Sequence, residues 1–232
     1  MSERIAYSVV LPSYLEEENL RLLLPRIRET LSSLPVATEI VVVDTVEALD
    51  ATESVCRENG ARYVKRRPAN TFGDAVRTGI AEAMGERIIF MDADGSHAPE
   101  FILKLIDQSD ANEIVIASRY VEGGVTENDK ALVLMSRVLN LTYSLFLNLK
   151  CKDVSNSFKI YRADLLKSLE LKCQNFDIVE EILFKIVRKN PGVRIKEIPF
   201  TFKKRMFGQT KRNLLGFMAT YLFTIIKLRL SS

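Results

Sequence analysis

Histidine and tryptophan are the scarcest residues of this 232-residue chain, which has a single His and no Trp. One imidazole, His97, excludes a histidine-rich metal site and any catalytic arrangement that needs a second histidine. We expect His97 to be a loop residue beside the carboxylates of Asp92 and Asp94. The chemistry of the chain must therefore come mainly from other side chains.

Cysteine is also sparse, and its spacing is not that of metal ligands. The three cysteines are Cys56, Cys151 and Cys173. Residues 1–4 (MSER) lack the apolar core of a secretory signal. These features predict a reducing, cytoplasmic setting in which the cysteines are buried thiols.

The composition predicts a folded protein and excludes disorder, because 47% of the residues are hydrophobic and 27% are charged. The length allows one sizeable core with a small appendage. No internal repeat or low-complexity linker divides the sequence. We predict one domain over residues 1–210 and a C-terminal amphipathic helix over residues 211–232.

Short β-branched runs alternate with helical patterns in the first half of the chain. The expected strands are residues 7–11, 39–43, 62–65, 87–91 and 113–117. Residues 40–43 (IVVV) are apolar on both faces, as a strand covered by helices on both sides requires. The alternation predicts an α/β fold with a mostly parallel, doubly wound sheet flanked by helices.

The fourth of these runs stops at two carboxylates, Asp92 and Asp94, in the segment 87–97 (RIIFMDADGSH). Taken alone, they fit a turn or the cap of the next helix as well as they fit a metal site. Carboxylates at a strand end also suit Mg²⁺ or Mn²⁺, which bridge to substrate phosphates. Polar residues follow the first and second strands as well, in the segment 12–16 (PSYLE) and at Asp44, so one site at this sheet edge is predicted.

The second half of the chain contains a long helical pattern at about residues 130–149. Its polar residues recur every four positions and form one stripe on an otherwise apolar rod, which suits burial or contact with lipid. The stripe consists of Ser136, Asn140, Ser144 and Asn148. A further helix is expected around residues 177–189, and residues 194–202 form an approximate strand in which Pro199 indicates an edge or an end.

Basic residues are concentrated near the C-terminus, where residues 200–232 contain seven Lys or Arg and no Asp or Glu. Residues 213–226 carry no charge, and this run is shorter than the ~20 residues that span a bilayer. We predict an amphipathic helix at a membrane surface rich in anionic lipids, with a core helix or a subunit contact as the alternative. Nucleic acid is not an expected partner, because the basic residues adjoin an apolar helix and form no basic groove.

Several motifs in the same order resemble those of family 2 glycosyltransferases with the A-type fold, in particular the polyprenol-phosphate (dolichol-phosphate) mannosyltransferases. The first-half motifs are residues 8–20 (SVVLPSYLEEENL), 39–44 (EIVVVD), 92–94 (DAD) and 117–120 (ASRY). The later ones are residues 120–124 (YVEGG), 136–140 (SRVLN), 153–162 (DVSNSFKIYR) and 197–211 (EIPFTFKKRMFGQTK). The resemblance implies a Rossmann-like sheet and transfer of a hexose, with inversion, from a nucleotide diphosphate sugar to a polyprenol phosphate.

The resemblance also implies the site residues. Those expected at the nucleotide sugar are Pro12, Tyr14, Glu16, Asp44, Asp92, Ala93 and Asp94. Those expected at the acceptor phosphate are Ser136, Arg137, Arg205 and Lys211, and those expected to act in catalysis are Asp94, Arg119 and Arg205. Asp92, Asp94 and Ser96 would hold Mg²⁺ or Mn²⁺. Glu16 and Asp44 have an alternative role as residues that start helices.

The chain departs from the family pattern where the donor base and the acceptor are recognised. Asp44-Thr45 replaces an acidic pair, with Glu47 or Asp50 as candidate substitutes for a missing aspartate. Further replacements are Ser96 for Gln, Leu132 for Arg and Leu15 for Asn, and the usual Trp is absent. The favoured donor is GDP-mannose with a UDP-sugar as the alternative, and the expected location is the cytosolic face of a membrane, on its surface or on a membrane subunit.

Two other functions compete with this interpretation. One is a family 2 enzyme that transfers from a UDP-sugar to a glycan, and the other is a non-catalytic subunit that binds nucleotide sugars. The altered Asp44-Thr45 and Leu132 positions motivate the second. Retention of both Asp92 and Asp94 counts against it. A nucleotidyltransferase is disfavoured because residues 12–18 (PSYLEEE) contain no glycine-rich basic loop.

Overall fold

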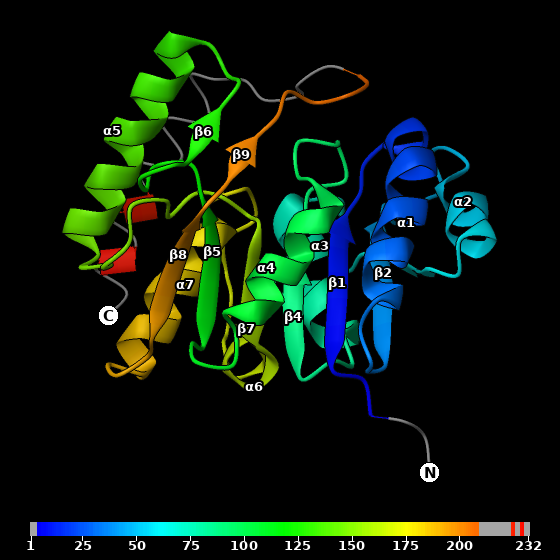
Figure 1. The fold of residues 1–232 in the computed structure, drawn as a ribbon, viewed down its shortest axis with the longest axis horizontal. Helices are drawn as coiled ribbons and strands as arrows, with labels where there is room; N and C mark the ends of the chain where they lie inside the picture. Colours follow the sequence, from blue (N-terminus) through cyan, green and yellow to red (C-terminus); the bar gives the residue numbers. More distant parts are fainter. Residues whose placement is uncertain (1–3, 209–223, 226–227, 230–232) are drawn as a thin grey trace.

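The computed structural model describes residues 4–208, 224–225 and 228–229, which form an α/β fold around a seven-stranded sheet (Figure 1). The strands of this sheet are β1 (Tyr7–Pro12), β2 (Thr38–Asp44), β3 (Arg62–Lys65), β4 (Arg87–Phe90), β5 (Ile114–Ser118), β7 (Lys159–Arg162) and β8 (Ile195–Pro199). A second sheet pairs two short strands, β6 (Val125–Thr126) and β9 (Thr201–Phe202). The five strands predicted in the first half are confirmed, with small shifts at their ends.

The strand order is β3-β2-β1-β4-β7-β5-β8. All of these strands except β7 run in the same direction. β7 lies antiparallel between β4 and β5. The predicted mostly parallel sheet is thus confirmed. The expectation for Pro199 is also confirmed, because it is the last residue of the edge strand β8, where a missing backbone N–H costs least.

Helices cover both faces of the sheet (Figure 1). They are α1 (Glu17–Ser32), α2 (Thr52–Glu58), α3 (Phe72–Glu82), the 3₁₀ turn η1 (Pro99–Phe101), α4 (Ile102–Asp107), α5 (Lys130–Phe146), α6 (Ala163–Lys167) and α7 (Ile178–Lys189). The helix predicted at residues 177–189 is confirmed as α7. The helix predicted at residues 130–149 is confirmed as α5, which ends three residues earlier.

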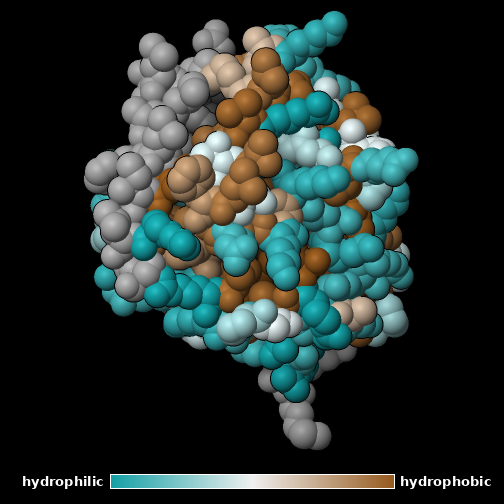
Figure 2. All heavy atoms as spheres, turned by 90° about the vertical axis from the view of Figure 1, so that its left-hand side faces the viewer, coloured by the Kyte–Doolittle hydropathy of each residue, from teal (hydrophilic) through white to brown (hydrophobic). Residues whose placement is uncertain are grey.

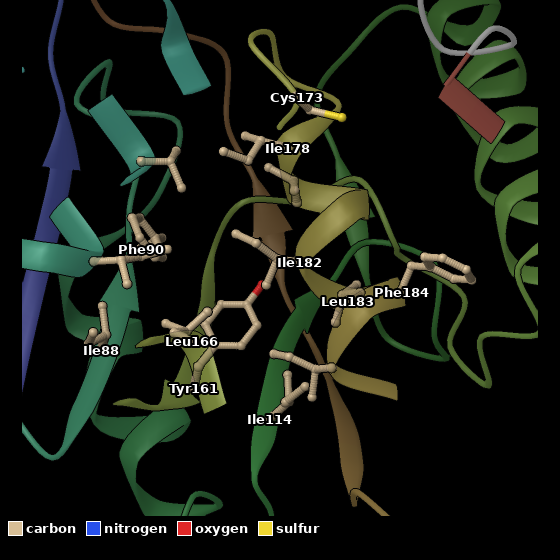
Figure 3. Close-up of a cluster of buried hydrophobic side chains, with 14 of the residues drawn as sticks. Ile88, Phe90, Ile114, Tyr161, Leu166, Cys173, Ile178, Ile182, Leu183 and Phe184 are labelled. Atoms are coloured by element: carbon tan, nitrogen blue, oxygen red, sulfur yellow. The ribbon is translucent and has the colours of Figure 1, made fainter. Parts of the chain in front are cut away.

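Side chains alternate between the two faces of each strand, and so the sheet separates two hydrophobic clusters. One cluster, which includes Val10, Phe90 and Tyr161, packs under α3, α6 and α7 (Figure 3). The other includes Val9, Val42 and Met91 and packs under α1, α2 and α4. This double burial explains why the strand sequences are apolar on both faces and holds their carboxyl ends at one rigid edge.

Helix α5 turns its polar stripe inward and its apolar side outward. Asn140 is 1% exposed, and its side-chain amide donates to the carbonyl oxygen of Ser136 and to the hydroxyl of Ser155. The outward apolar residues, from 57% to 69% exposed, are Leu134, Val138, Leu141, Leu145 and Phe146. Figure 2 shows hydrophobic side chains gathered on this face. Ser136, Asn140 and Ser144 of the predicted stripe therefore lie on the side that packs on the protein, whereas Asn148 lies beyond the end of α5 and is exposed.

The predicted C-terminal helix over residues 211–232 lies largely outside the described residues, and Lys211 is one of those left out. The described part includes Thr224, Ile225 and Leu228, all of them buried. Thr224 Oγ1 donates to Asp177 Oδ2 at 2.6 Å, at the start of α7. At these positions the structure agrees with the core-helix alternative. Within the residues that the structure describes, no helix is long and apolar enough to cross a membrane.

Candidate active site

The parallel strands β1, β2 and β4 place Pro12, Asp44 and Asp92 at the same edge of the sheet, as predicted. Asp44 ends β2 and is 1% exposed, and α2 begins only at Thr52, so the helix-start alternative is wrong for Asp44. Tyr63 donates to Asp44 Oδ2 at 3.2 Å, while Oδ1 is buried without a hydrogen-bond partner among the described residues. Burial raises the pKa of Asp44. An unpaired buried acceptor of this kind fits a hydroxyl or N–H of a ligand.

Arg66 is a further residue of this edge, and no motif in the sequence indicated it. It is 3% exposed, and its guanidinium donates to the carbonyl oxygens of Ser13, Asp44 at 3.1 Å and Thr71 at 3.2 Å. It therefore ties the ends of β1 and β2 to the start of α3. Buried guanidinium groups are stable only when their donors are satisfied, and here main-chain oxygens satisfy them.

Glu16 is the N-cap residue of α1, so its helix-start alternative is confirmed by position. Its side chain makes no capping hydrogen bond. It accepts instead from Asn19 Nδ2 at 2.6 Å and pairs with Arg205 from the other end of the chain. Burial raises the pKa of Glu16, although Arg205 and Asn19 oppose that rise. Tyr14, by contrast, is 40% exposed beside it.

Asp92 and Asp94 lie at a tight turn that continues into Gly95, whose φ is +82°. Asp92 Oδ1 accepts from Ser157 Oγ at 2.7 Å. Asp94 Oδ1 accepts from the backbone N–H and the hydroxyl of Ser96, at 3.0 and 2.6 Å. Burial opposes ionisation of Asp94, but the hydrogen bonds from Ser96 and the charge of Arg205 keep its pKa below the usual value.

This turn has the oxygen chemistry of a Mg²⁺ or Mn²⁺ site. In the part of the chain that the structure describes, no group of three His, Cys, Asp or Glu could hold a metal. The turn offers two carboxylates, and the other ligands of an ion there would be substrate oxygens and water, which is the pattern Mg²⁺ favours. Ser96 is 1% exposed and its hydroxyl hydrogen is directed to Asp94, so it supports that carboxylate. Ala93 is buried between the two acids.

The segment 203–208 crosses this turn after β9. Lys203 and Met206 donate from their backbone N–H groups to the carbonyl oxygens of Ser96 and Asp94, at 3.1 and 2.9 Å. Arg205 Nε lies 3.5 Å from Asp94 Oδ2. Arg205 thus lies among the carboxylates at the strand ends. The sequence motifs predict it also at the acceptor phosphate.

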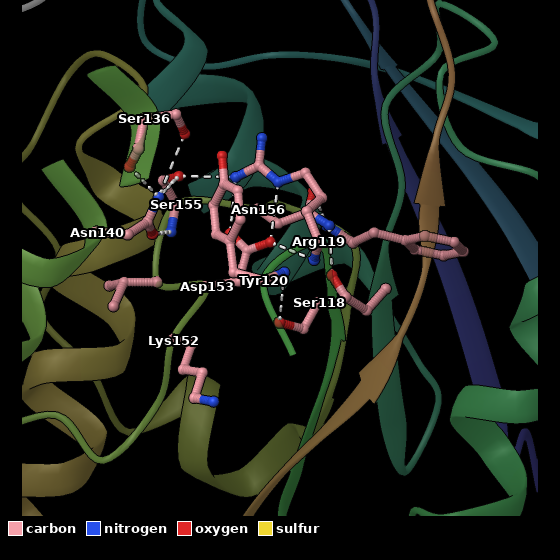
Figure 4. Close-up of polar contacts among 12 residues, drawn as sticks. Ser118, Arg119, Tyr120, Ser136, Asn140, Lys152, Asp153, Ser155 and Asn156 are labelled. Carbon is pink, nitrogen blue, oxygen red and sulfur yellow. Dashed lines mark hydrogen bonds and ion pairs between the residues drawn. The ribbon is translucent and has the colours of Figure 1, made fainter. Parts of the chain in front are cut away.

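A second group of predicted residues gathers beyond the end of β5 (Figure 4). The Asp153 carboxylate binds Arg119. It accepts from the backbone N–H of Arg119, from its Nε at 2.9 Å and from its Nη2 at 2.7 Å. The guanidinium carbons of Arg119 and Arg137 lie 5.0 and 5.6 Å from the ring centroid of Tyr120, on which both cations pack.

A cavity of about 450 Å³ lies beside these arginines. Its lining includes the cations Arg119, Arg137 and Lys130 and the apolar residues Val125, Val133 and Leu134. Lys130, the first residue of α5, was not predicted from the sequence. Ser136 and Arg205 are not among the lining residues, and Ser136 instead accepts from Asn140 through its backbone carbonyl oxygen. Three cations beside apolar walls suit an anionic group attached to a hydrocarbon.

Residues 153–157 connect this cavity with the acidic turn, because neighbouring residues of the segment face different partners. Asp153 and Ser155 bind Arg119, the latter at 3.0 Å from Nη2. Ser157 binds Asp92, and Asn156 contacts His97 at 3.2 Å. His97 lies beside the carboxylates as predicted, but it is completely buried, and burial lowers its pKa.

Comparison with known proteins identifies the family. Residues 8–170 match the family model described as Glycosyl transferase family 2, which is more than half of the chain. The chain belongs to glycosyltransferase family 2. It is a glycosyltransferase, and its A-type fold and strand-end acids agree with that membership.

This family 2 glycosyltransferase is similar to two curated relatives. It is 34% identical over 217 residues to the dolichol-phosphate mannosyltransferase of Pyrococcus furiosus, covering 88% of this chain and 58% of the relative. It is 30% identical over 221 residues to the dolichol-phosphate mannosyltransferase of Saccharomyces cerevisiae, covering 89% of this chain and 81% of the relative. The chain thus spans little more than half of the archaeal relative.

Solved structures with the same fold include glucosyl-3-phosphoglycerate synthase from Mycobacterium tuberculosis. Its complex with Mn²⁺, UDP and glucosyl-3-phosphoglycerate superposes with a TM-score of 0.69 at 19% identity, covering 98% of this chain and 79% of that one. The complex of the same enzyme with Mn²⁺ and UDP-glucose gives a TM-score of 0.71 at 20% identity, with 97% and 79% coverage. At this identity the likeness establishes the fold of this glycosyltransferase, not its substrates.

Proposed function

We propose that this glycosyltransferase transfers a hexose, with mannose favoured, from a nucleotide diphosphate sugar to a polyprenol phosphate, with inversion at the anomeric carbon. The observation that carries the proposal is the joining of an acidic turn to a cavity lined by cations and apolar residues, through residues 153–157. An acidic turn suits a metal-bound diphosphate, and the cavity suits a lipid phosphate. The names of the two curated relatives support the same pair of substrates.

On the donor side, Asp92 and Asp94 would hold Mg²⁺ or Mn²⁺, with Ser96 supporting Asp94 and Ala93 between them. A bound divalent ion neutralises the charge that develops on a departing nucleoside diphosphate. Asp44 Oδ1, which no described residue hydrogen-bonds, would accept from the nucleoside, and Pro12, Tyr14 and Glu16 would complete the nucleoside-binding surface. GDP-mannose is the favoured donor and a UDP-sugar the alternative.

On the acceptor side, Arg119, Arg137 and Lys130 would bind the phosphate, and Val133 and Leu134 would contact the first isoprenoid carbons. Ser136 and Lys211 are also predicted to bind the acceptor phosphate. A phosphate is already anionic near neutral pH, so direct displacement at the anomeric carbon needs no general base. The buried state of His97 agrees with this route, since its ring has no access to a nucleophile. Arg205, beside Asp94, is placed to stabilise the leaving diphosphate.

The outer face of α5 would rest on a lipid surface at the cytosolic face of a membrane. Leu134 belongs both to this face and to the lining of the cavity, so the apolar surface runs into the proposed acceptor site. Lys130 and Arg137 lie on the same helix and would meet anionic headgroups. This arrangement lets a polyprenol phosphate enter the cavity while its hydrocarbon stays in lipid.

A donor panel tests the function. The purified chain is incubated with a short-chain polyprenyl phosphate and each of GDP-mannose, GDP-glucose, UDP-glucose and UDP-N-acetylglucosamine, with Mn²⁺, Mg²⁺ or EDTA, and products are read by mass. We expect a hexosyl phosphoryl lipid with GDP-mannose, an anomeric linkage opposite to that of the donor by NMR, and no product in EDTA. Absence of lipid product with every donor would overturn the proposal.

A further inference from the structure

His97 is a buried polar side chain for which neither substrate binding nor proton transfer gives a use. Its ring is 0% exposed. It stacks on Phe158 with centroids 4.7 Å apart, and the rings of Phe200 and Phe202 meet it edge-on at 5.8 and 5.6 Å. Burying an imidazole in an aromatic cage costs free energy unless both of its nitrogens find partners.

Both nitrogens do find partners, and the first one fixes the tautomer. The backbone N–H of Asp92 donates to Nδ1 of His97 at 3.0 Å. Because a backbone amide can only donate, Nδ1 carries no hydrogen, and the ring proton is on Nε2. Nε2 then donates to Asn156 Oδ1 at 3.2 Å.

Asn156 extends this contact to β5, which β7 separates from β4 in the sheet. Its Nδ2 donates to the carbonyl oxygen of Ala117 in β5 at 2.5 Å. A continuous line of hydrogen bonds therefore runs from β5 through Asn156 and His97 to the main chain of Asp92. The last hydrogen bond involves the backbone N–H of Asp92, whose side chain would bind the divalent ion.

We propose that His97, held by Asn156, is a positioning residue that fixes the main chain of Asp92 and so aims its carboxylate at the divalent ion. The Ser157 hydroxyl holds one oxygen of the same carboxylate, so the acid is constrained from both ends. Partners that orient a metal ligand typically change metal affinity 10- to 100-fold when they are removed. This inference rests on the proposed function, because it takes the acidic turn to be the metal site.

Three substitutions of His97 distinguish the roles of its two ring nitrogens. In His97→Asn the side-chain oxygen can take the place of Nδ1 and accept from Asp92, whereas in His97→Gln the amide reaches the place of Nε2 and the acceptor for Asp92 is lost. His97→Phe keeps the aromatic packing and loses both hydrogen bonds. Asn and Gln are similarly polar, so the pair controls for the cost of burying an amide.

Mn²⁺ binding is measured by electron paramagnetic resonance, with GDP and separately with UDP, on the wild-type chain and on each variant that retains a cooperative thermal transition. We expect the Mn²⁺ dissociation constant to rise about tenfold or more in His97→Gln and His97→Phe and to stay within about threefold in His97→Asn. The KM for polyprenyl phosphate should not change in any variant, which distinguishes positioning of Asp92 from a general loosening of the fold.

Equal Mn²⁺ affinity in all four proteins would overturn the role of His97, and so would a loss in His97→Asn as large as that in His97→Gln. If His97→Phe fails to fold, the Asn and Gln pair still decides the matter. Failure of the wild-type chain to bind Mn²⁺ with either nucleotide would overturn the proposed metal site itself. The two failures are therefore distinguishable.

Discussion

The donor and acceptor sides of the proposed site use charge in opposite ways. On the donor side, the carboxylates of Glu16 and Asp94 lie around Arg205, and one buried oxygen of Asp44 has no hydrogen-bond partner in the described part of the chain. On the acceptor side, the buried carboxylate of Asp153 forms an ion pair with Arg119, and cationic side chains line the cavity. In the proposed function, the donor side would need a cation to bind a diphosphate, whereas the acceptor side would bind a phosphate with protein groups alone.

The largest expected effect is loss of the donor side. Asp92→Asn and Asp94→Asn keep the size of each side chain and remove its charge, so a divalent ion should bind poorly. We expect kcat/KM with GDP-mannose to fall at least about 100-fold in a turnover assay with Mn²⁺. Asp107→Asn, at an exposed position of α4, is the matched control and should leave turnover unchanged. Undiminished turnover in both acidic-turn variants would place the metal elsewhere.

A smaller effect is expected when the acceptor side loses geometry but not charge. Arg119→Lys keeps the cation and removes the planar fork that both Asp153 and a phosphate can bind in pairs. The KM for polyprenyl phosphate should rise about tenfold in steady-state assays, with little change in the KM for the sugar donor. Arg28→Lys, on the exposed side of α1, serves as the control. Equal increases in both KM values would remove the distinction between the two sides.

The outer face of α5 tests whether the acceptor side continues into lipid. Leu141 and Leu145 are 60% and 69% exposed, and their joint replacement by Gln removes apolar area that would enter a membrane. We expect the fraction bound to vesicles with anionic lipid to fall severalfold in a sedimentation assay, while turnover of a water-soluble short-chain acceptor is kept. The control replaces Leu22 and Leu49, which are 50% and 47% exposed elsewhere. Identical losses in the two double variants would refute a specific lipid-facing side.

The smallest effect concerns the junction between the two sides. Lys159 is fully buried, its ammonium donates to the carbonyl oxygens of Val154 at 2.9 Å and of Asn156, and burial lowers its pKa to about 8. The unfolded chain therefore holds this proton more tightly, and stability contributed by Lys159 should rise as the pH increases from 8 towards 10.

Urea unfolding at pH 7.5 and 9.5 measures this contribution as the difference between the wild-type chain and Lys159→Met. We expect the wild type to gain about 1 kcal/mol relative to the variant at the higher pH. The comparison cancels the titration of the other buried groups, which both proteins share. A difference that does not depend on pH would mean that the ammonium is not penalised by burial.

Local patterns were enough to predict the parallel strands of the sheet and the acidic turn. The β-branched runs fixed the strands, and the place where the run before Asp92 ends fixed the turn. The reach of Arg66 to Ser13, 53 residues away in sequence, leaves no periodic signal, and neither does the pairing of Arg205 with Glu16 across 189 residues. The same reason hid the role of residues 153–157, because the motif is visible in the sequence but its partners come from segments that are far apart in the chain.

The polar stripe of α5 illustrates a different limit. Its spacing identified a helix with two unlike faces, but spacing alone does not say which face meets the protein. The inward side carries the polar stripe together with Tyr143 and Leu139, and there Asn140 hydrogen-bonds with Ser136 and Ser155. An ordinary surface helix shows the opposite arrangement.

The antiparallel direction of β7 brings residues 153–157 between the proposed donor and acceptor sites. A strand that runs against its neighbours begins at the edge where they end, so the residues just before β7 arrive where the loops after β1, β2 and β5 also arrive. Inserting or deleting one residue among 153–157 would change the register of both halves at once, whereas a length change after β2 would reach only the nucleoside. In the proposed function, residues 153–157 would therefore set the spacing between donor and acceptor, and redesign of either specificity should leave the length of this segment unchanged.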